Sequence, residues 1–409
     1  MEIERYINPM KILIFNTLYF PYRVGGAELS VQILAESLAV NGHEVTIMTL
    51  HEKDEVEKEY ENKVEIIRLP LLNRYWVTST QQSSIKKILW HVQDIYNCRM
   101  KKAVSQALIN KKFDLVHTNN LCGFSVAVWD WAKSNDIPIV HTARDYYLMN
   151  PNSKLYRRGR NHSSKTLDSW LFSFYKKIKS HKVNAFVGIS SYIKERHVKN
   201  GYFKRASKHV IYNAIKSPVL LEEKSIYSFF RDEIILGFLG RIESSKGIEL
   251  LLDAMHKYND QNIFIKIAGK GESEYIDYLK KKYSNVHMEF VGTVKIEKFL
   301  PQLNFLIVPS QWNEPFGRVV IEANSYGIPV IASNKGGIPE IVVPNVTGYV
   351  FETENHLSLI DSIKKIKSMS ANEYHEMKKS ALIFSRGFDT RQITNLYLEV
   401  YQTAVNKYK

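Results

Sequence analysis

Short runs of consecutive apolar residues occur along the chain, and each is followed by a loop and then by a segment with helical periodicity. One series opens at residues 11–16 (KILIFN), and a second opens at residues 234–240 (IILGFLG). The runs are continuous and do not alternate with polar residues, as in strands that are buried on both faces of a parallel sheet. The pattern therefore predicts the α/β class, with two Rossmann-like, doubly wound parallel sheets.

The order of these segments also predicts the domain organisation. The chain has 409 residues, whereas single cores stop growing at roughly 250–300 residues. The charged segment 217–231 interrupts the pattern and is the predicted linker. We expect a first domain over 10–216, a second over 217–388, and a last helix over about 389–409. Further strands are predicted at 45–50, 64–69, 114–117, 137–142, 185–190 and 209–213, and in the second series at 263–269, 286–292, 304–310 and 329–333.

The chain is basic, with 56 Lys and Arg against 42 Asp and Glu and a net charge of +14. This excess fits a generally basic, soluble surface, and it also fits an anionic partner such as nucleic acid, a membrane face or a phosphorylated substrate. Basic residues gather within 154–182, where the apolar and aromatic run 167–175 separates them. This mixture suits a peripheral membrane surface at least as well as a nucleic-acid groove.

The number of cysteines and the N-terminal residues indicate the cellular compartment in which the protein is expected. Cys98 and Cys122 are too few for a disulfide framework, which favours a reduced cytoplasmic compartment. Residues 1–9 lack the pattern of a signal peptide and are interpreted as an extension before the first strand. No stretch reaches the ~18 apolar residues that span a bilayer. We expect a cytoplasmic protein, with a peripheral position on the inner face of the membrane as a further option.

The loop 240–247 (GRIESSKG) follows the first strand of the second series, where ligands of open α/β sheets bind. Arg241 and Lys246 flank this loop. Together they can neutralise a pyrophosphate without a metal ion. The alternative is a solvated basic loop.

The segment 313–322 (NEPFGRVVIE) carries two carboxylates behind a later strand. Glu314 and Glu322 can each accept hydrogen bonds from adjacent hydroxyls of a sugar or ribose. The pair could therefore hold two rings of one nucleotide-sugar. The alternative for Glu322 is an ion pair with Arg318, four residues earlier on the same helix.

Two pairs of glycines lie between a strand and a helix. Gly25 and Gly26 stand in 21–28 (PYRVGGAE), and a second pair stands in 333–340 (SNKGGIPE). Adjacent glycines allow close approach of the backbone to a ligand, and a helix N-terminus favours an anion. The alternative is that each pair only makes a turn.

The segment 141–145 (HTARD) supplies the titratable candidates of the first domain. His141 and Asp145 are candidates for proton transfer or for orienting a neighbour, and His117 is comparable. A histidine at a strand end is more often structural, and this alternative stays open.

Several motifs of phosphate and cofactor enzymes do not occur in the sequence. There is no Asp-x-Asp triplet, no phosphate-binding P-loop and no G-x-G-x-x-G fingerprint. We therefore expect no metal and no cofactor, with charge neutralised by Arg241, Lys246 and helix N-termini.

Taken together, these segments resemble glycosyltransferase family 4 (glycosyl transferases group 1), which comprises retaining enzymes of the GT-B fold. The resemblance covers nearly the whole chain. Residues 314–342 (EPFGRVVIEANSYGIPVIASNKGGIPEIV) resemble the family's two-glutamate motif and the Gly-Gly turn behind it. Residues 237–254 (GFLGRIESSKGIELLLDA) resemble its phosphate-binding loop, and 21–28 resemble its N-terminal Gly-Gly loop.

The resemblance implies two domains facing across a cleft that holds a nucleotide-diphosphate-sugar, with UDP as the expected nucleotide. Arg241 and Lys246 would bind the diphosphate, Glu322 the ribose and Glu314 the transferred sugar. The last helix would pack back on the first domain. The implied donor-site residues are Gly25, Gly26, Arg241, Lys246, Gly269, Gly271, Thr293, Val294, Glu314, Phe316, Gly317 and Glu322.

The sequence departs from the family in the first domain. Many members have His-Asp where this chain has Arg144 and Asp145. Arg144 could assist as a fixed positive charge, and His141 lies three residues earlier. The catalytic candidates are Arg241, Lys246, Glu314, His141, Arg144 and Asp145.

The resemblance implies transfer of a hexose, with retention, to a hydroxyl of a lipid-linked saccharide or a surface-polysaccharide precursor. An anionic membrane surface is a further expected partner. The alternatives are a sugar-nucleotide epimerase of the same architecture and, from another class, a basic nucleic-acid-binding protein. No helix-turn-helix, zinc or RNP signature supports the last, so we expect no nucleic-acid partner.

Overall fold

The computed structural model describes residues 8–22, 24–76, 79, 82–164, 166–216 and 233–408. The predicted linker 217–231 and most of the predicted extension 1–9 lie outside the described residues. The chain forms two compact units. The first comprises Met1–Leu155, Ser163–Ala214 and Thr390–Lys409, and the second comprises Tyr156–His162 and Ile215–Asp389.

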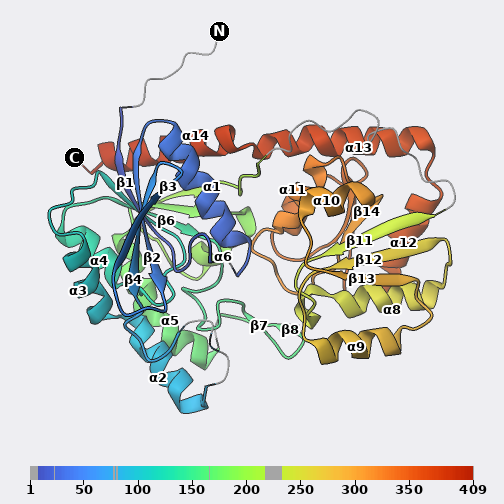
Figure 1. Ribbon diagram of the computed structural model, residues 1–409, viewed down its shortest axis with the longest axis horizontal. Helices are drawn as coiled ribbons and strands as arrows, with labels where there is room; N and C mark the ends of the chain where they lie inside the picture. The colour runs from blue at the N-terminus through green and yellow to red at the C-terminus, as the bar shows by residue number, and fades with distance from the viewer. Residues whose placement is uncertain are drawn as a thin grey trace, which may run out of the picture. The chain divides into compact units, whose positions relative to one another are not determined.

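The first unit contains an eight-stranded sheet with the order β10-β9-β6-β5-β1-β2-β4-β3 (Figure 1). All neighbouring strands are parallel except β3 and β4. The strands are β1 (Lys11–Phe15), β2 (Glu44–His51), β3 (Glu57–Glu61), β4 (Val64–Pro70), β5 (Leu115–Thr118), β6 (Ile139–Ala143), β9 (Ala185–Gly188) and β10 (Ser207–Val210). Strand β3 was not predicted, because its sequence EKEYE contains no apolar run and its side chains stay largely outside the core.

Helices connect these strands and complete the first unit. They are α1 (Gly26–Val40), α2 (Ser84–Ile95), α3 (Cys98–Ala107), α4 (Ala127–Ser134), α5 (Leu167–Lys179), η1 (Ser180–Lys182), α6 (Ser191–Lys199) and the C-terminal α14 (Thr390–Asn406). At the start of helix α1, the carboxylate of Glu28 accepts a hydrogen bond from the amide of the N-cap residue Gly25.

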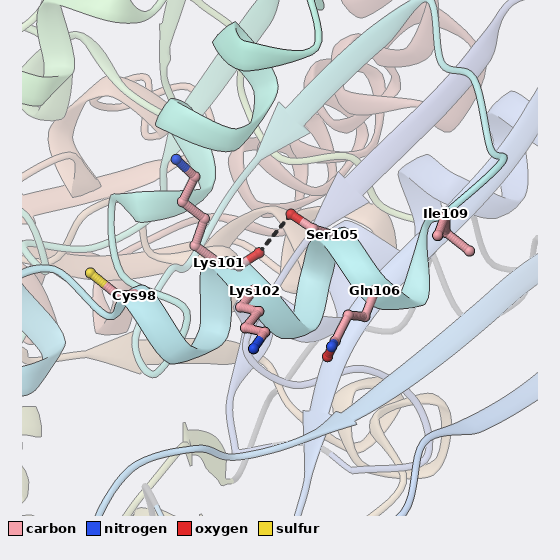
Figure 2. A pocket seen from close by; sticks show the side chains of 6 residues that line it. All are labelled: Cys98, Lys101, Lys102, Ser105, Gln106 and Ile109. Carbon is pink, nitrogen blue, oxygen red and sulfur yellow. Dashed lines mark hydrogen bonds between the residues drawn. The ribbon is translucent and has the colours of Figure 1, made fainter.

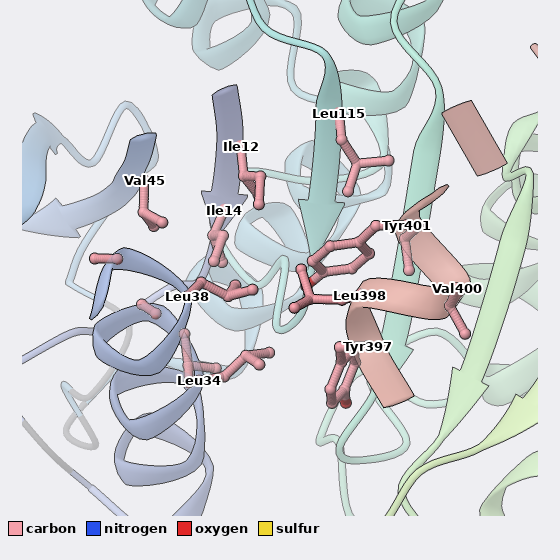
Figure 3. Close-up of a cluster of buried hydrophobic side chains, with 14 of the residues drawn as sticks. Ile12, Ile14, Leu34, Leu38, Val45, Leu115, Tyr397, Leu398, Val400 and Tyr401 are labelled. Carbon is pink, nitrogen blue, oxygen red and sulfur yellow. The ribbon is translucent and has the colours of Figure 1, made fainter. Parts of the chain in front are cut away.

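The C-terminal helix α14 is part of the core of the first unit (Figure 3). Leu398 and Tyr401 of α14 are buried in the same cluster as Ile12 of β1 and Leu38 of α1. Such burial removes apolar surface from water and holds the last residues of the chain in this unit.

A buried polar network also holds α14. Nδ1 of His117 lies 2.7 Å from the hydroxyl of Tyr401, and Nε2 lies 2.8 Å from Oγ1 of Thr142 on β6. Buried polar groups need such partners, because their hydration is lost on folding. The network therefore ties α14 to β5 and β6.

The second unit contains a six-stranded, parallel sheet with the order β13-β12-β11-β14-β15-β16. The strands are β11 (Ile234–Leu239), β12 (Ile263–Ala268), β13 (Met288–Gly292), β14 (Phe305–Val308), β15 (Val330–Ser333) and β16 (Gly348–Phe351), beside a separate hairpin of β7 (Tyr156–Arg157) and β8 (Arg160–Asn161). The predicted α/β class with two parallel sheets is confirmed.

Helices of the second unit follow the same alternation. They are η2 (Ser244–Lys246), α8 (Ile248–Tyr258), α9 (Ser273–Lys282), α10 (Ile296–Phe299), η3 (Leu300–Gln302), α11 (Arg318–Ser325), η4 (Ile338–Ile341), α12 (His356–Lys367), α13 (Ala371–Ser385) and η5 (Arg386–Phe388). Within the described ranges, none of the helices combines the length and the apolar character needed to span a bilayer.

We expect Tyr401→Phe to lower the free energy of unfolding of the first unit by about 1–3 kcal/mol, because Nδ1 of buried His117 loses its partner. Urea unfolding followed by tryptophan fluorescence measures this, since Trp312 is the only tryptophan outside the first unit.

Tyr60→Phe is the matched control, because Tyr60 of β3 is 73% exposed. It should change the free energy by no more than about 0.5 kcal/mol. Equal stability of Tyr401→Phe and the wild-type protein would contradict the structural role of the network.

Candidate functional site

The loops after β11 and β14 are fixed to each other at the carboxyl edge of the second sheet. The carbonyl oxygen of Ser245 accepts hydrogen bonds from the amides of Gln311 and Trp312, at 3.0 and 3.2 Å. Gly247 has φ +75°, and a Cβ there would lie 1.8 Å from the carbonyl oxygen of Pro309. Only glycine allows this close approach. The contact sets the position of Lys246 relative to the segment that carries Glu314.

Lys246 and Glu314 form an ion pair within the second unit. Nζ of Lys246 donates to Oε1 of Glu314 at 2.7 Å and lies 5.3 Å from the ring centre of Trp312. The two side chains are 20% and 12% exposed. Partial burial keeps water from screening this pair as fully as it screens a surface pair.

Arg241 lies on the same loop and is more accessible. Its side chain is 44% exposed, and Nη2 lies 3.1 Å from Oε1 of Glu243. Glu243 also accepts a hydrogen bond from Oγ of Ser245. Both cations of the loop are therefore paired with carboxylates, and Arg241 is the more accessible of the two.

The glycine pair after β15 packs against the backbone of Glu314. Gly336 has φ +62°, and a Cβ there would lie 2.1 Å from the carbonyl oxygen of Glu314. The amide of Gly337 donates to the same oxygen at 2.8 Å. The turn at Gly336 and Gly337 thus fixes the backbone of Glu314.

Phe316 and Gly317 connect Glu314 to α11. Phe316 is buried, and Gly317 precedes α11 with φ +94°. A Cβ on Gly317 would lie 2.9 Å from Cγ1 of Ile338. The turn at Gly317 therefore packs against η4, which follows Gly336 in the sequence.

Glu322 lies on α11 and is paired there. Nε of Arg318 donates to Oε1 of Glu322 at 2.6 Å, so the ion pair weighed in the sequence analysis is present. Burial raises the pKa of the Glu322 carboxyl, and the Arg318 guanidinium opposes this rise. The carboxylate is held in a fixed orientation by its neighbour one turn away.

The loop after β12 adjoins the Arg241 loop, and the loop after β13 follows the next strand of the sheet. Gly269 has φ +148°, and a Cβ there would lie 1.7 Å from the carbonyl oxygen of Gly240. Gly271 forms an isolated bridge with Ile242. Thr293 is exposed and Val294 is half-buried, immediately after β13. Consecutive strands of the sheet thus bring these loops to the same edge.

In the first unit, the loop with Gly25 and Gly26 binds the carboxylate of Glu28. Gly25 and Gly26 are exposed, and the amide of Gly25 donates to Oε2 of Glu28 at 2.9 Å. Burial raises the pKa of Glu28, while the backbone donors oppose this rise. The sequence analysis missed this role of Glu28, although its position three residues after the N-cap is the spacing of a capping box.

His141 is enclosed in the core of the first unit. Its Nδ1 lies 2.8 Å from Oγ1 of Thr118, and its ring stacks on Phe203 and meets the edge of Trp129. Burial lowers the pKa of His141 well below its usual value, and that of His117 likewise. These surroundings are those of structural histidines.

Arg144 and Asp145 are held by asparagines. Arg144 donates from Nε to Oδ1 of Asn119 at 2.9 Å and from Nη1 to Oδ1 of Asn213 at 2.5 Å. Asp145 accepts from Nδ2 of Asn120 at 2.8 Å, and burial raises its pKa to about 6. Arg144 is therefore a fixed charge, and Asp145 is a carboxyl that titrates closer to neutrality than usual.

The second unit thus brings Arg241, Lys246 and Glu314 to one edge of its sheet, and α11 places Glu322 behind the Gly317 turn. Sequence reasoning missed Trp312 and Glu243, which contact the two cations. Among the residues that the structure describes, no group of three or more acidic, histidine or cysteine side chains is arranged to hold a metal ion.

We expect Gly336→Ala to destabilise the second unit far more than Gly292→Ala does. Both positions have positive φ, which costs an alanine about 1 kcal/mol, but no atom lies within 4 Å of a Cβ on Gly292. Displacing the backbone of Glu314 should cost Gly336→Ala about 1–3 kcal/mol more. Calorimetric unfolding compares the two variants, and equal losses would contradict the packing described here.

Comparison with known proteins places the chain in a family. The family model described as "Glycosyl transferases group 1" matches residues 221–382. The model described as "Glycosyltransferase Family 4" matches residues 24–217. An uncharacterized 42.6 kDa protein in the cps region of Klebsiella pneumoniae is 38% identical over 397 residues, covering 96% of this chain and 100% of that protein. The O-antigen biosynthesis glycosyltransferase WclY of Escherichia coli is 28% identical over 208 residues, or 49% of this chain and 57% of WclY.

A solved structure shows the same fold. The crystal structure of Anabaena HepE in complex with UDP and glucose has a TM-score of 0.70, 17% identity, and covers 96% of this chain and 100% of that one. The two parallel-sheet α/β units are those of the GT-B fold. The chain therefore belongs to glycosyltransferase family 4, the glycosyl transferases group 1.

Proposed function

We propose that the chain transfers a hexose from a UDP-sugar, with retention, to a hydroxyl of a lipid-linked saccharide or surface-polysaccharide precursor. The UDP and glucose named with HepE support the donor class. The name of WclY supports a polysaccharide product. The observation that carries the proposal is the Lys246–Glu314 contact in the second unit.

That contact fits the geometry of the donor. In a nucleotide-diphosphate-sugar, the transferred ring and its phosphate share one oxygen. The groups that bind the ring and the phosphate must therefore be neighbours. Nζ of Lys246 lies 2.7 Å from Oε1 of Glu314, so a cation suited to phosphate adjoins an acceptor suited to sugar hydroxyls.

The cations supply what the proposed reaction needs. As the bond between sugar and diphosphate breaks, the sugar takes on oxocarbenium character and negative charge grows on the departing diphosphate. Lys246 and the accessible Arg241 would stabilise that charge. Interactions that strengthen in the transition state raise the rate, whereas uniform binding does not. The proposal needs neither a metal nor another cofactor.

The remaining residues would take the roles that the family resemblance implies. Glu322, oriented by Arg318, would accept hydrogen bonds from the ribose hydroxyls. The loops after β12 and β13 would lie near the base: Gly269, Gly271, Thr293 and Val294.

The first unit would contribute groups of its own. Gly25 and Gly26 would let the backbone approach the phosphates closely. Arg144 is the candidate for a fixed positive charge and Asp145 for proton transfer, since both side chains are held by asparagines. His141, enclosed by aromatic rings, is the weaker candidate.

We expect Lys246→Ala to lower the rate of UDP release from UDP-glucose at least about 100-fold, with water taking the glucosyl group, because it removes a charge that stabilises the leaving group. Lys298→Ala is the matched control, since Lys298 lies exposed on α10, and it should keep wild-type turnover. Wild-type turnover in Lys246→Ala would refute the assignment. Proton NMR of the released glucose, recorded before its anomers interconvert, should show the anomeric configuration of the donor, and inversion would contradict the proposed retention.

We expect Glu322→Gln to weaken UDP affinity about tenfold, because a charged acceptor strengthens each hydrogen bond from the ribose. Calorimetric titration with UDP and with 2′,3′-dideoxy-UDP separates this role from a structural one. The wild-type protein and Glu376→Gln, an exposed control on α13, should prefer UDP. Glu322→Gln should lose the preference, and an unchanged preference would rule out ribose binding by Glu322.

A further inference from the structure

Helix α5 exposes its apolar face to solvent. Leu167, Trp170, Leu171, Phe174, Tyr175 and Ile178 are exposed at intervals of three and four residues, which places them on one stripe. The opposite stripe is polar and buried, with Ser169, Ser173 and Lys176. A helix on the surface of a soluble protein normally has the reverse orientation.

Helix α2 shows the same reversal. Its exposed residues Ile85, Ile88, Leu89 and Val92 also follow intervals of three and four. The acidic residue of α2, Asp94, is buried instead. Two neighbouring helices of the first unit therefore direct apolar stripes outward.

A buried ion pair fixes this orientation. Nζ of Lys176 lies 3.7 Å from Oδ2 of Asp94 and 3.5 Å from the ring centre of Tyr147. Oδ1 of Asp94 accepts the amide of Gly123 at 2.7 Å. Rotating either helix to bury its apolar stripe would expose or separate these charged groups, and an unpaired buried charge is costly.

The two helices also contact each other. The rings of His91 on α2 and Phe172 on α5 lie 6.0 Å apart. We call the ten exposed apolar residues the α2–α5 surface. An apolar surface of this extent on a soluble unit marks an interaction site.

Cations adjoin the α2–α5 surface. Lys86 and Lys87 are exposed on α2, and Lys177 is half-buried on α5. Arg74 and Arg99 line a hollow of about 440 Å³ together with Gln93 of α2. Lys101 and Lys102 line a second hollow on α3, which begins three residues after α2 ends (Figure 2).

The lysines of α5 and η1 within the basic cluster expected at 154–182 are less available than the sequence suggested. Lys176 is buried, and Lys179 and Lys182 both pair with Asp130, at 2.6 and 2.7 Å. The apolar stripes of the two helices are thus the main feature of this region. In the first unit, accessible cations lie on α2, on α3, in the segment before α2 and at Lys177 of α5, whereas Arg157, Arg158 and Arg160 are exposed in the second unit.

We infer that the α2–α5 surface docks the chain on a lipid bilayer that contains anionic headgroups, which deepens the proposed function and rests on it for the nature of the acceptor. Apolar side chains would enter the acyl boundary, Trp170 and Tyr175 would suit the interface, and the lysines would meet the headgroups. A second copy fits less well, because a protein–protein contact through this surface would remove Lys86 and Lys87 of α2 from water, whereas anionic headgroups would pair with them.

The test compares two double variants in sedimentation with vesicles of two parts phosphatidylcholine and one part phosphatidylglycerol. Ile88→Ser with Leu171→Ser changes side chains that are 54% and 58% exposed. Val40→Ser with Ile383→Ser is the control, at 69% and 52% exposure on α1 and α13. We expect the wild-type protein and the control to bind, and the α2–α5 variant to bind at least tenfold more weakly.

Binding should also weaken in pure phosphatidylcholine and at 0.5 M salt. Failure of the wild-type protein to sediment with the anionic vesicles, or equal binding by both double variants, would overturn the inference. The inference would also be overturned if the wild-type protein and the control were dimers in analytical ultracentrifugation and only the α2–α5 variant were a monomer. UDP binding measured without vesicles tests the proposed function separately, and it should be unchanged in both double variants.

Discussion

The ion pair between Lys246 and Glu314 is the interaction on which the account of the site depends. Its two partners come from loops after different strands, 68 positions apart, and neither loop could place its charge alone. Glycines at 247 and 336 let three loops pack backbone against backbone, which leaves the side chains little freedom. A site fixed in advance in this way loses little entropy when a ligand binds.

The two units use buried charge differently. In the second unit, the charged residues at the edge of the sheet remain partly accessible, as a binding site requires. In the first unit, Asp94 and Lys176 are fully enclosed, and burial raises the pKa of Asp94 to about 6. This ion pair fixes the orientation of α2 and α5, because it keeps their apolar stripes facing outward. Burying this pair is costly, and the proposed bilayer contact gives the outward orientation of the two helices a use.

Much of the fold could be predicted from the sequence, because strands buried on both faces leave continuous apolar runs. Strand β3 could not, since an edge strand made of EKEYE owes its conformation to pairing with β4 and not to burial. The loop positions of Arg241, Lys246 and Glu314 followed from the strand ends. Their pairing did not, because it depends on backbone packing at glycines. Nor could the sequence separate Lys176, which is buried, from Lys177 beside it.

The central claim is that Lys246 and Glu314 bind adjoining parts of one donor molecule. The most direct measurement is a crystal structure of the protein with UDP-glucose. We expect a phosphate oxygen within hydrogen-bond distance of Nζ of Lys246 and a glucose hydroxyl within hydrogen-bond distance of the Glu314 carboxylate. A donor bound elsewhere, with the Lys246–Glu314 ion pair intact and untouched, would contradict it.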